Sequence, residues 1–289
     1  MEILKALNLS KIYQTGGSAV YALNDVTLSI EEGSFVAITG PSGSGKSTLL
    51  HLLSGLDKPT HGTVTYRDKD LYKYNDNQLS VLRRRRFGFV FQSYNLVKEL
   101  TGYENMLLPV MLDSKNPDEA YLNRIIEILG IGDRLSHLPG AMSGGQQQRF
   151  SIARALANKP AILFADEPTG NLDGKAGREV LTLLRTVAHD LGITLVLVTH
   201  DLRVAEQADR IIRLEDGKIA SDSGVKLCRS SPIPPLQKLG SGPIIGSTEV
   251  LYSESFCPFS WSVCLFWPFT VFIRVRWNSA IGKSEIWTW

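Results

Sequence analysis

The sequence predicts an α/β fold with a mainly parallel β-sheet at its core. Two observations support this prediction. A Gly/Ser-rich loop at 40–48 follows an apolar, strand-like run at 34–39 and leads into a helical pattern. Three further apolar runs, at 87–91, 161–165 and 193–199, each end in polar side chains. The carboxyl ends of parallel strands meet at one edge of a sheet, where a ligand crevice forms, so these polar residues are expected to lie together.

Length and composition limit the class of protein. A chain of 289 residues is long enough for one large domain, or for one domain with an appendage, around a sizeable core. Lys and Arg number 31 and Asp and Glu number 29, so the near-neutral balance gives no reason to expect a nucleic-acid partner. The chain starts with an early acid, Glu2, and no apolar run of signal-peptide length. We therefore expect no signal peptide and a cytoplasmic location.

The N-terminal stretch is expected to form strands joined by turns. Residues 2–9 alternate between apolar and polar side chains, and residues 20–30 form a second extended run. Tyr13 lies between these runs, and two roles are open to it. It is either an aromatic side chain packed at a strand end or a flat surface on which a ligand ring stacks.

The loop after the strand at 34–39 fits the pattern G-x-x-x-x-G-K-[ST], which cradles nucleotide phosphates. Its glycines allow positive φ, so several backbone N–H groups can converge on phosphate oxygens. Lys46 supplies a positive charge for the β and γ phosphates, and the Ser47 hydroxyl is placed to ligate Mg²⁺. The following helix directs its positive N-terminus at the anion. The loop residues are Gly40, Pro41, Ser42, Gly43, Ser44, Gly45, Lys46, Ser47 and Thr48.

A Gly/Ser-rich surface loop is the plain alternative to a phosphate site. The strand before the loop and the helix after it favour the phosphate site. The sequence therefore predicts that the chain binds a nucleoside triphosphate, and this makes base stacking the favoured role of Tyr13.

The next elements lead to a polar residue at a strand end. Residues 62–66 are expected to form a strand, and the basic segment 78–86 ends in consecutive arginines, 83–86. Such a run can contact phosphate or nucleic acid, but a solvated face leading into a strand is the commoner outcome and is expected here. The apolar run 87–91 then delivers Gln92 at its carboxyl end, where an amide can both orient water and ligate Mg²⁺.

Residues 100–142 change in character and predict a helical insert that stands away from the sheet. Apolar residues recur at helical spacing, and Pro109, Pro117 and Pro139 are expected to interrupt the helices. The apolar residues at this spacing are Leu107, Leu108, Met111, Tyr121, Ile125, Ile126, Ile128 and Leu129.

The insert ends in Ser143, Gly144, Gly145 and Gln146, just before a helical pattern at 147–158. Ser-Gly-Gly ahead of a helix presents free N–H groups and a hydroxyl to an anion. A plain helix cap is the alternative that these residues leave open. The apolar stripe of the helix consists of Phe150, Ala153, Leu156 and Ala157.

Two carboxylates follow the apolar strand at 161–165. A strand buried on both faces ends in carboxylates only where they meet water or have a chemical task. Asp166 suits Mg²⁺ ligation, directly or through water, and Glu167 can act as general base on the attacking water. Asp173 comes shortly afterwards in a tight connector, ahead of an amphipathic helix.

His200 ends the buried strand at 193–199. A lone histidine is usually a polar core or surface residue. One at the carboxyl end of a parallel strand beside a phosphate site is placed to contact the γ-phosphate. The first 225 residues close with an expected hairpin at 211–219, around Asp216 and Gly217.

Together these motifs occur in the order found in the ATP-binding cassette (ABC) ATPases, and residues 2–222 resemble that family. The resemblance implies a P-loop NTPase fold of ABC type at 1–225, with an N-terminal antiparallel β subdomain and a helical signature subdomain at about 93–145. It implies a head-to-tail homodimer, or a paired cassette, that hydrolyses ATP with Mg²⁺. Each ATP would lie between the phosphate loop of one subunit and residues 143–146 of the other.

The same resemblance implies a role for each candidate site residue. Tyr13 would stack on adenine, Glu167 would be the catalytic carboxylate, and His200 would contact the γ-phosphate. Asp173 would couple the two sites of the dimer. The expected catalytic residues are Lys46, Gln92, Glu167 and His200, and the expected Mg²⁺ ligands are Ser47, Gln92 and Asp166.

The resemblance also implies a partner. Gln92 and the segment 96–111 would meet the coupling helix of an integral-membrane permease, which places the chain peripherally on the inner face of the cell membrane. Residues 88–92, 104–105 and 168–173 look like the branch that includes lipoprotein-release, macrolide-export and bacitracin-resistance ATPases. Members of that branch often drive their partner by mechanotransmission. Residues 103–109 lean toward members that confer antimicrobial-peptide resistance.

Two other classes of function remain open. A soluble, non-transport ABC ATPase acting on DNA or ribosomes would normally carry two cassettes or a coiled-coil insertion, and this chain has neither. An inactive, nucleotide-binding regulatory cassette would be expected to lose Glu167 or His200, and both are present. The expected function is therefore that of an ATPase subunit in a transport complex, with no nucleic-acid partner.

The tail at 226–289 differs in composition from the rest of the chain. All 3 cysteines and all 5 tryptophans lie after residue 225. Residues 230–247 are rich in Pro, Gly and Ser, as in a linker, and residues 256–273 carry no charge over the length of a membrane span. Three explanations remain open: a non-native or disordered tail, such as one read out of frame, a membrane-associating segment, or a packed extension.

Overall fold

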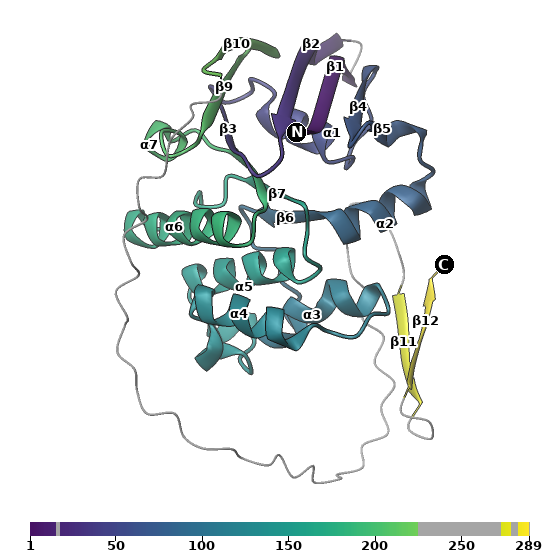
Figure 1. Ribbon diagram of the computed structural model, residues 1–289, viewed down its shortest axis with the longest axis vertical. Coiled ribbons are helices and arrows are strands. Elements are labelled where there is room, and N and C mark those ends of the chain that lie inside the picture. Colours follow the sequence, from purple (N-terminus) through teal and green to yellow (C-terminus); the bar gives the residue numbers. More distant parts are fainter. Residues whose placement is uncertain (16–17, 225–272, 279–282, 289) are drawn as a thin grey trace. The chain divides into compact units, whose positions relative to one another are not determined.

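The computed structural model describes residues 1–15, 18–224, 273–278 and 283–288 (Figure 1). The chain divides into two units, Met1–Ile233 and Pro234–Trp289. The second unit contains an antiparallel hairpin of β11 (Ile273–Asn278) and β12 (Lys283–Thr288). All of the elements from β1 to β10 belong to the first unit.

Most of the predictions for the tail fall outside the described residues. The linker expected at 230–247 lies there, and so does the uncharged run at 256–273 apart from its last residue. Within the described part of the chain, no helix has the length and apolar character needed to cross a bilayer.

A six-stranded sheet forms the centre of the first unit, in the order β10-β9-β3-β8-β7-β6. The strands from β9 to β6 pair in parallel, and β10 runs antiparallel to β9 at the edge. The predicted α/β fold with a mainly parallel core is therefore confirmed. The strands are β3 (Phe35–Thr39), β6 (Phe87–Phe91), β7 (Ile162–Asp166), β8 (Thr194–Val198), β9 (Arg210–Glu215) and β10 (Lys218–Asp222).

The central sheet is covered on both faces, which explains the continuous apolar sequences of its parallel strands. Val36 and Ile38 of β3 belong to a hydrophobic core shared with α1 and the N-terminal strands. Phe35 and Ala37 belong to a second core, on the side of α3 to α6. The α-helices of these layers are α1 (Lys46–Leu53), α3 (Gly102–Leu112), α4 (Glu119–Leu129), α5 (Gly144–Leu156), α6 (Gly174–Asp190) and α7 (Leu202–Ala205).

A four-stranded antiparallel sheet, in the order β2-β1-β4-β5, lies on the α1 side. Tyr13 lies inside β1, opposite Val20, and not between two strands as the sequence had indicated. β1 contains register shifts, one of them between Ala6 and Leu9, which break the alternation of side chains while pairing continues. The strands are β1 (Glu2–Thr15), β2 (Ser18–Glu31), β4 (His61–Tyr66) and β5 (Lys69–Asp70).

The hairpin predicted near residues 211–219 is formed by β9 and β10. Asp216 and Gly217 have φ values of 47° and 74°, and this pair of positive values is what a type I′ turn requires. The turn also touches the phosphate-loop region, because the Gly217 N–H donates to the Ser44 carbonyl at 3.2 Å.

The helical insert differs from its prediction at one proline. Pro109 lies inside α3, so the expectation that it interrupts a helix was wrong. The helix persists because Met106 and Val110 are buried in the core, and because the Asn158 side-chain amide donates to the Pro109 carbonyl at 2.9 Å. Pro117 precedes α4. The short 3₁₀ turns are Leu71–Lys73, Gly132–Arg134 and Pro139–Ala141.

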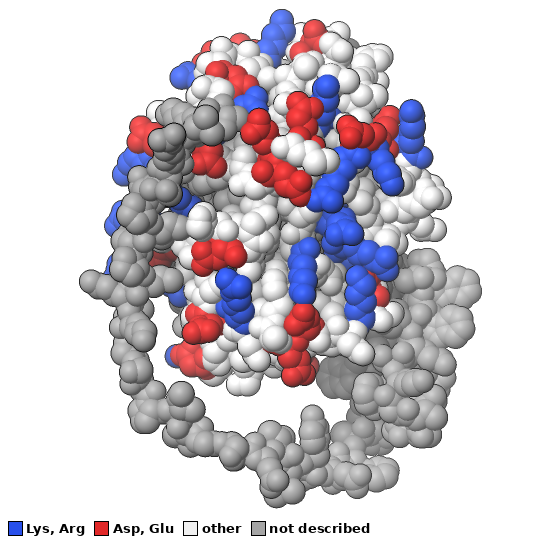
Figure 2. Space-filling model, viewed as in Figure 1, with Lys and Arg blue, Asp and Glu red and all other residues white. Residues whose placement is uncertain are grey.

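The basic segment forms α2 (Asp76–Arg86) and runs directly into β6, as expected. Its arginines are not simply solvated, however. Arg83 donates to a backbone carbonyl of the loop after α1, and Arg84 and Arg85 both donate to the Asp113 carboxylate. Figure 2 shows Lys and Arg gathered over this part of the surface, with both signs interspersed elsewhere on the same face.

Candidate active site

The phosphate loop, residues 40–48, joins β3 to α1 at the carboxyl edge of the central sheet. Gly40 and Gly45 have φ values of 147° and 96°, in the region that favours glycine. A Cβ at either position would lie 2.2 Å from a backbone oxygen, that of Leu214 for Gly40 and that of Ala22 for Gly45. Both glycines are therefore required by close backbone approach, which keeps the loop tight enough for its N–H groups to converge.

Two polar side chains inside the loop are held ready for an anion. Lys46 is 7% exposed, and its ammonium donates to the carbonyls of Gly40 at 3.0 Å and Pro41 at 2.8 Å. The Ser44 hydroxyl is buried and has no hydrogen-bond partner among the described residues. An unpaired buried hydroxyl is uncommon, and a phosphate oxygen placed in the loop would satisfy it.

Ser47 and Asp166 meet where the start of α1 faces the end of β7. The Ser47 hydroxyl donates to Asp166 Oδ1 at 3.1 Å. Burial raises the pKa of Asp166, and the hydrogen bond from Ser47 acts against that rise. No group of three or more His, Cys, Asp or Glu side chains that could hold a metal occurs in the described ranges. One hydroxyl and one carboxylate suit a hard cation such as Mg²⁺, which usually takes its other ligands from phosphate and water.

Glu167 and His200 are brought together by neighbouring parallel strands. Asp166 of β7 lies opposite Val198 of β8, and the Glu167 N–H donates to the Val198 carbonyl at 3.0 Å. The Glu167 carboxylate lies 3.3 Å from His200 Nδ1. Glu167 has a φ of 45°, an unusual value for a non-glycine residue and one that is found preferentially at functional sites.

Gln92 lies at the same edge, because Phe91 of β6 is paired with Asp166 of β7. Its side chain, however, is bound to a residue to which the sequence prediction gave no role. Gln92 Nε2 donates to Asn171 Oδ1 at 3.2 Å, and Asn171 Nδ2 donates to the Gln92 carbonyl at 3.0 Å. A cation would be ligated by Gln92 Oε1, which is not the side-chain atom that donates to Asn171.

Arg154 and Gln148 of α5 are further residues that the sequence prediction missed. Arg154 donates to the carbonyls of Tyr94 and Asn95, and burial lowers its pKa to about 10. Gln148 is fully buried and donates to the Pro168 carbonyl at 2.7 Å. Both side chains lie in a helix next to its apolar stripe, and a polar residue placed there is the signal that could have revealed them.

Residues 143–146 and Asp173 lie at helix starts and not at the phosphate loop of the same chain. Ser143 and Gln146 form a reciprocal capping box at the start of α5. Asp173 caps α6 by accepting from the Lys175 and Ala176 N–H groups, which lower its pKa. Within the parts of the chain that are described, no hydrogen bond joins either group to residues 40–48.

Tyr13 is 40% exposed. Its hydroxyl donates to Asp57 Oδ2 at 3.0 Å. Burial raises the pKa of Tyr13, the hydrogen bond to Asp57 raises it further, and the Thr48 side chain has the opposite effect on the same phenol. Tyr13 is therefore close to Thr48, the last residue of the loop.

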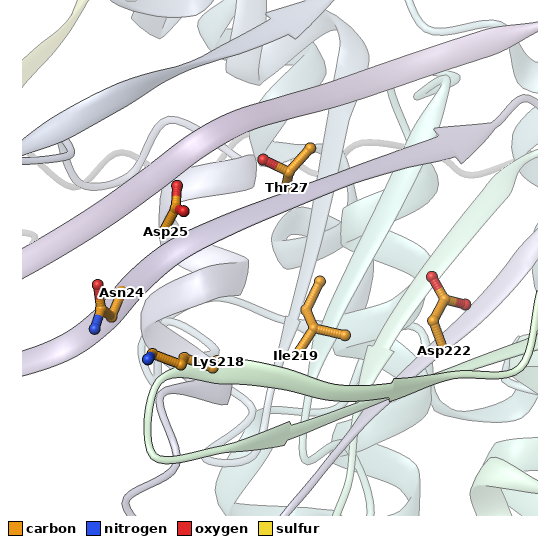
Figure 3. Close-up of a pocket in the computed structure, with 6 residues that line it drawn as sticks. All are labelled: Asn24, Asp25, Thr27, Lys218, Ile219 and Asp222. Carbon is orange, nitrogen blue, oxygen red and sulfur yellow. The ribbon is translucent and has the colours of Figure 1, made fainter.

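A surface cavity of about 510 Å³ lies elsewhere, between β2 and the β9–β10 hairpin (Figure 3). None of the site residues predicted from the sequence lines it, and its one lysine is exposed. The cavity therefore offers no converging phosphate donors. Its lining residues are Asn24, Asp25, Thr27, Lys218, Ile219 and Asp222.

Comparison with known proteins places these features in a family. The family model described as ABC transporter matches residues 23–170. An uncharacterised ABC transporter ATP-binding protein, MJ1508 of Methanocaldococcus jannaschii, is 48% identical over 221 residues, which cover 75% of this chain and 97% of the relative. The lipoprotein-releasing system ATP-binding protein LolD of Idiomarina loihiensis is 42% identical over 77% of this chain and 98% of its own length.

Two further comparisons extend this result. The macrolide export ATP-binding/permease protein MacB of Hyphomonas neptunium is 42% identical over 83% of this chain, which spans 38% of that longer protein. A dimeric structure of the ATP-binding cassette MJ0796, bound to ADP and Pi in a post-hydrolysis state, matches with a TM-score of 0.69 and 43% identity. That match covers 76% of this chain and 97% of the solved one.

Proposed function

The chain belongs to the ABC transporter ATPase family, and on that premise we propose that it binds and hydrolyses ATP as a subunit of a membrane transport complex. One observation carries this proposal: the phosphate loop and the strand-end residues meet at one edge of the central sheet. Ser47 contacts Asp166 there, and Glu167 contacts His200. These contacts bring phosphate binding and a general base to the same place.

The phosphate loop holds the triphosphate in this proposal. The Lys46 ammonium exchanges its contacts with the Gly40 and Pro41 carbonyls for the β and γ phosphate oxygens. The unpaired Ser44 hydroxyl becomes a further donor. The Tyr13 ring, beside the end of the loop, stacks on the adenine base.

We assign Mg²⁺ to Ser47 and Asp166, with the side-chain oxygen of Gln92 as a further ligand. When bound, the cation would offset the negative charge of the phosphates. A cation at this position would also favour the ionised form of Asp166, whose pKa burial raises in its absence.

Glu167 performs the hydrolytic step in this proposal. Its carboxylate accepts a proton from the water that attacks the γ-phosphorus, and the bond from that phosphorus to the bridging oxygen of ADP breaks. His200 lies 3.3 Å from Glu167 and is 67% exposed, so it is free to turn toward the γ-phosphate. The products are ADP and inorganic phosphate.

Two copies of the chain form the working unit. Residues 143–146 and Asp173 lie at the starts of α5 and α6, and in the described residues no hydrogen bond joins them to the phosphate loop of their own chain. We assign them to the ATP held by the partner copy in a head-to-tail homodimer. The related cassette MJ0796 was solved as a dimer.

An integral-membrane permease is the proposed partner, with the chain peripheral on the inner face of the membrane. α3 carries exposed apolar side chains, with Tyr103 37% and Met111 54% exposed. We assign this face of α3, together with residues 92–101, to the permease. Met111→Asp is expected to abolish co-purification with the permease from solubilised membranes, and undiminished co-purification would remove this assignment.

LolD and MacB indicate the kind of work that the complex performs. Those relatives carry the names of a lipoprotein-releasing system and of macrolide export. We propose a mechanotransmission role for this chain, in lipoprotein release or in antimicrobial-peptide resistance or export. We also propose that residues 1–225 form the ATPase domain, with its helical subdomain at about 93–145. Removing residues 226–289 is then expected to leave ATP hydrolysis intact, and a loss of hydrolysis would contradict this boundary.

Steady-state ATP hydrolysis by the purified chain tests the function itself. Glu167→Gln is expected to lower kcat by at least about a hundredfold, because the amide cannot accept the proton, while ATP still binds. Lys46→Ala is expected to abolish both ATP binding and hydrolysis. If the unmodified chain binds ATP without hydrolysing it, the proposed enzyme activity is overturned in favour of a regulatory cassette.

A further inference from the structure

Lys11 and Asp57, which have no role in the function proposed above, form a cluster with Tyr13. Lys11 Nζ donates to Asp57 Oδ1 at 2.8 Å, and the Tyr13 hydroxyl donates to Asp57 Oδ2 at 3.0 Å. Lys11 Nζ also lies 5.0 Å from the centroid of the Tyr13 ring. One carboxylate therefore binds both side chains, and the cation lies over the ring that we assign to the adenine base.

The cluster joins two elements that bind different parts of the nucleotide. Lys11 and Tyr13 lie in β1, whereas Asp57 lies in the loop that follows α1, the phosphate-loop helix. Backbone contacts reinforce the link, since the Ile12 N–H donates to Thr60 Oγ1 at 3.0 Å and Lys11 Nζ donates to the Lys58 carbonyl at 2.7 Å. The ring and the phosphate loop are thus connected through a few short contacts.

The environment of Lys11 distinguishes this cluster from an ordinary surface ion pair. The side chain of Lys11 is 13% exposed and that of Asp57 is 33% exposed. Burial acts to raise the pKa of Asp57, but the hydrogen bonds from Lys11 and Tyr13 outweigh it, and the pKa is lowered. Exposed pairs contribute little to stability, whereas a mostly buried ammonium needs the partners that it has here.

The position of the cation also decides which face of the ring is available. Lys11 occupies one face of Tyr13, in a cation–π arrangement. A base can therefore stack only on the opposite face. Tyr13 as a residue is 40% exposed, so part of its side chain is open to a ligand.

We propose that Lys11 and Asp57 are positioning residues that fix the Tyr13 ring relative to the phosphate loop. A nucleotide can then stack its base on Tyr13 while its phosphates bind the loop. This inference rests on the proposed function, because it needs ATP at the phosphate loop. The competing explanation is that the cluster only staples β1 to the loop after α1. A purely structural link would affect the stability of the fold. Its loss would change the affinity for a ligand with a base and for one without a base to the same extent.

The test compares the binding of two ligands by titration calorimetry. Full-length chain carrying Glu167→Gln, which binds without turnover, is titrated with MgATP and with magnesium tripolyphosphate, which has no base. Adding Lys11→Met is expected to weaken MgATP binding by about fivefold or more, within the range of a lost aromatic stack. The affinity for tripolyphosphate is expected to change less than about twofold, because the phosphate loop is intact.

Two further variants keep the test independent of folding. Lys11→Arg retains a cation and is expected to restore MgATP affinity, whereas Asp57→Asn removes the charge that holds Lys11 and is expected to behave like Lys11→Met. The matched control is Lys58→Met, which removes a nearby ion pair to Asp76 whose side chains are 65% and 87% exposed. This control is expected to bind both ligands like the parent chain.

The outcomes separate the two proposals. Equal loss of MgATP and tripolyphosphate binding in Lys11→Met, or MgATP binding as tight as in Lys58→Met, overturns the positioning role. Failure of the parent chain to bind either ligand overturns the proposed function instead. Selective loss of MgATP binding in Lys11→Met, restored in Lys11→Arg, supports the positioning role.

Discussion

Asp113 is the most heavily paired carboxylate in the described part of the chain. It caps the end of α3, its side chain is fully buried, and Arg84, Arg85 and Lys115 all contact it. Burial acts to raise its pKa, but the three cations outweigh that effect and lower the pKa to about 2. Arg84 and Arg85 of α2 thus stabilise the connection between the sheet and the helical insert.

This pairing predicts a pH-dependent stability. A carboxyl whose pKa is lower in the folded state stabilises the protein above its unfolded pKa of about 4, and that stability is lost as the pH falls toward about 2. Asp113→Asn is expected to lower the free energy of unfolding at pH 7 by roughly 2 kcal/mol. Urea denaturation of both proteins at several pH values measures this. The difference in the free energy of unfolding between the two proteins should become smaller below pH 4. A difference that stays constant with pH would contradict the assignment.

Among the helices, α3 and α5 begin with the same capping motif. Thr101 and Glu104 form a capping box at α3, and Ser143 and Gln146 form one at α5. Each box satisfies backbone N–H groups that would otherwise lack a partner at a helix start. The two boxes should therefore contribute similarly to stability, whereas only the box at α5 lies in the segment that we assign to ATP.

The matched pair Ser143→Ala and Thr101→Ala tests this distinction. Each substitution is expected to cost about 1 kcal/mol of stability, because each removes the side-chain acceptor of one cap. ATP hydrolysis is expected to fall at least tenfold in Ser143→Ala and to stay near the parent value in Thr101→Ala. Thermal unfolding and steady-state hydrolysis measure the two effects. Equal activity in the two variants would assign Ser143 to helix capping alone.

At the scale of the whole molecule, the ATPase is expected to be complete only as a dimer. The phosphate loop, Glu167 and His200 lie together within one chain, whereas Ser143 and Asp173 cap other helices. A head-to-tail arrangement supplies the second set from the partner copy. Each site would then draw on two chains, which makes the assembly testable by mixing variants.

Mixing Lys46→Ala with Ser143→Ala is expected to restore hydrolysis. Each variant alone forms a homodimer in which both sites are damaged. A mixed dimer contains one site with both the intact lysine and the intact serine, and one site that lacks both. At equal amounts of the two chains, about a quarter of the parent activity should return. Activity no higher than that of the separate variants would argue against sites shared between chains.

Much of the fold and of the candidate site could be predicted from the sequence, because the decisive signals are local. The loop that ends in Lys46 and Ser47 lies between its own strand and helix, and the buried strands placed Gln92, Asp166 and His200 at one edge of the sheet. The lengths of the strands were less predictable, and so was the position of Pro109 inside a continuous helix. Bulges let β1 pair beyond its alternating pattern, and tertiary packing holds α3 together through its proline.

The phosphate loop, the mainly parallel character of the core and the resemblance to the family could all be inferred from the residues, since each short motif and each continuous apolar run is a local pattern in the chain. The contacts between side chains that are distant in the sequence became visible in the folded chain. Gln92 is bound to Asn171, and Lys11 and Tyr13 are bound to Asp57. The physical reason is that such contacts depend on how strands and loops distant in sequence pack against one another, and no local pattern of residues encodes that packing.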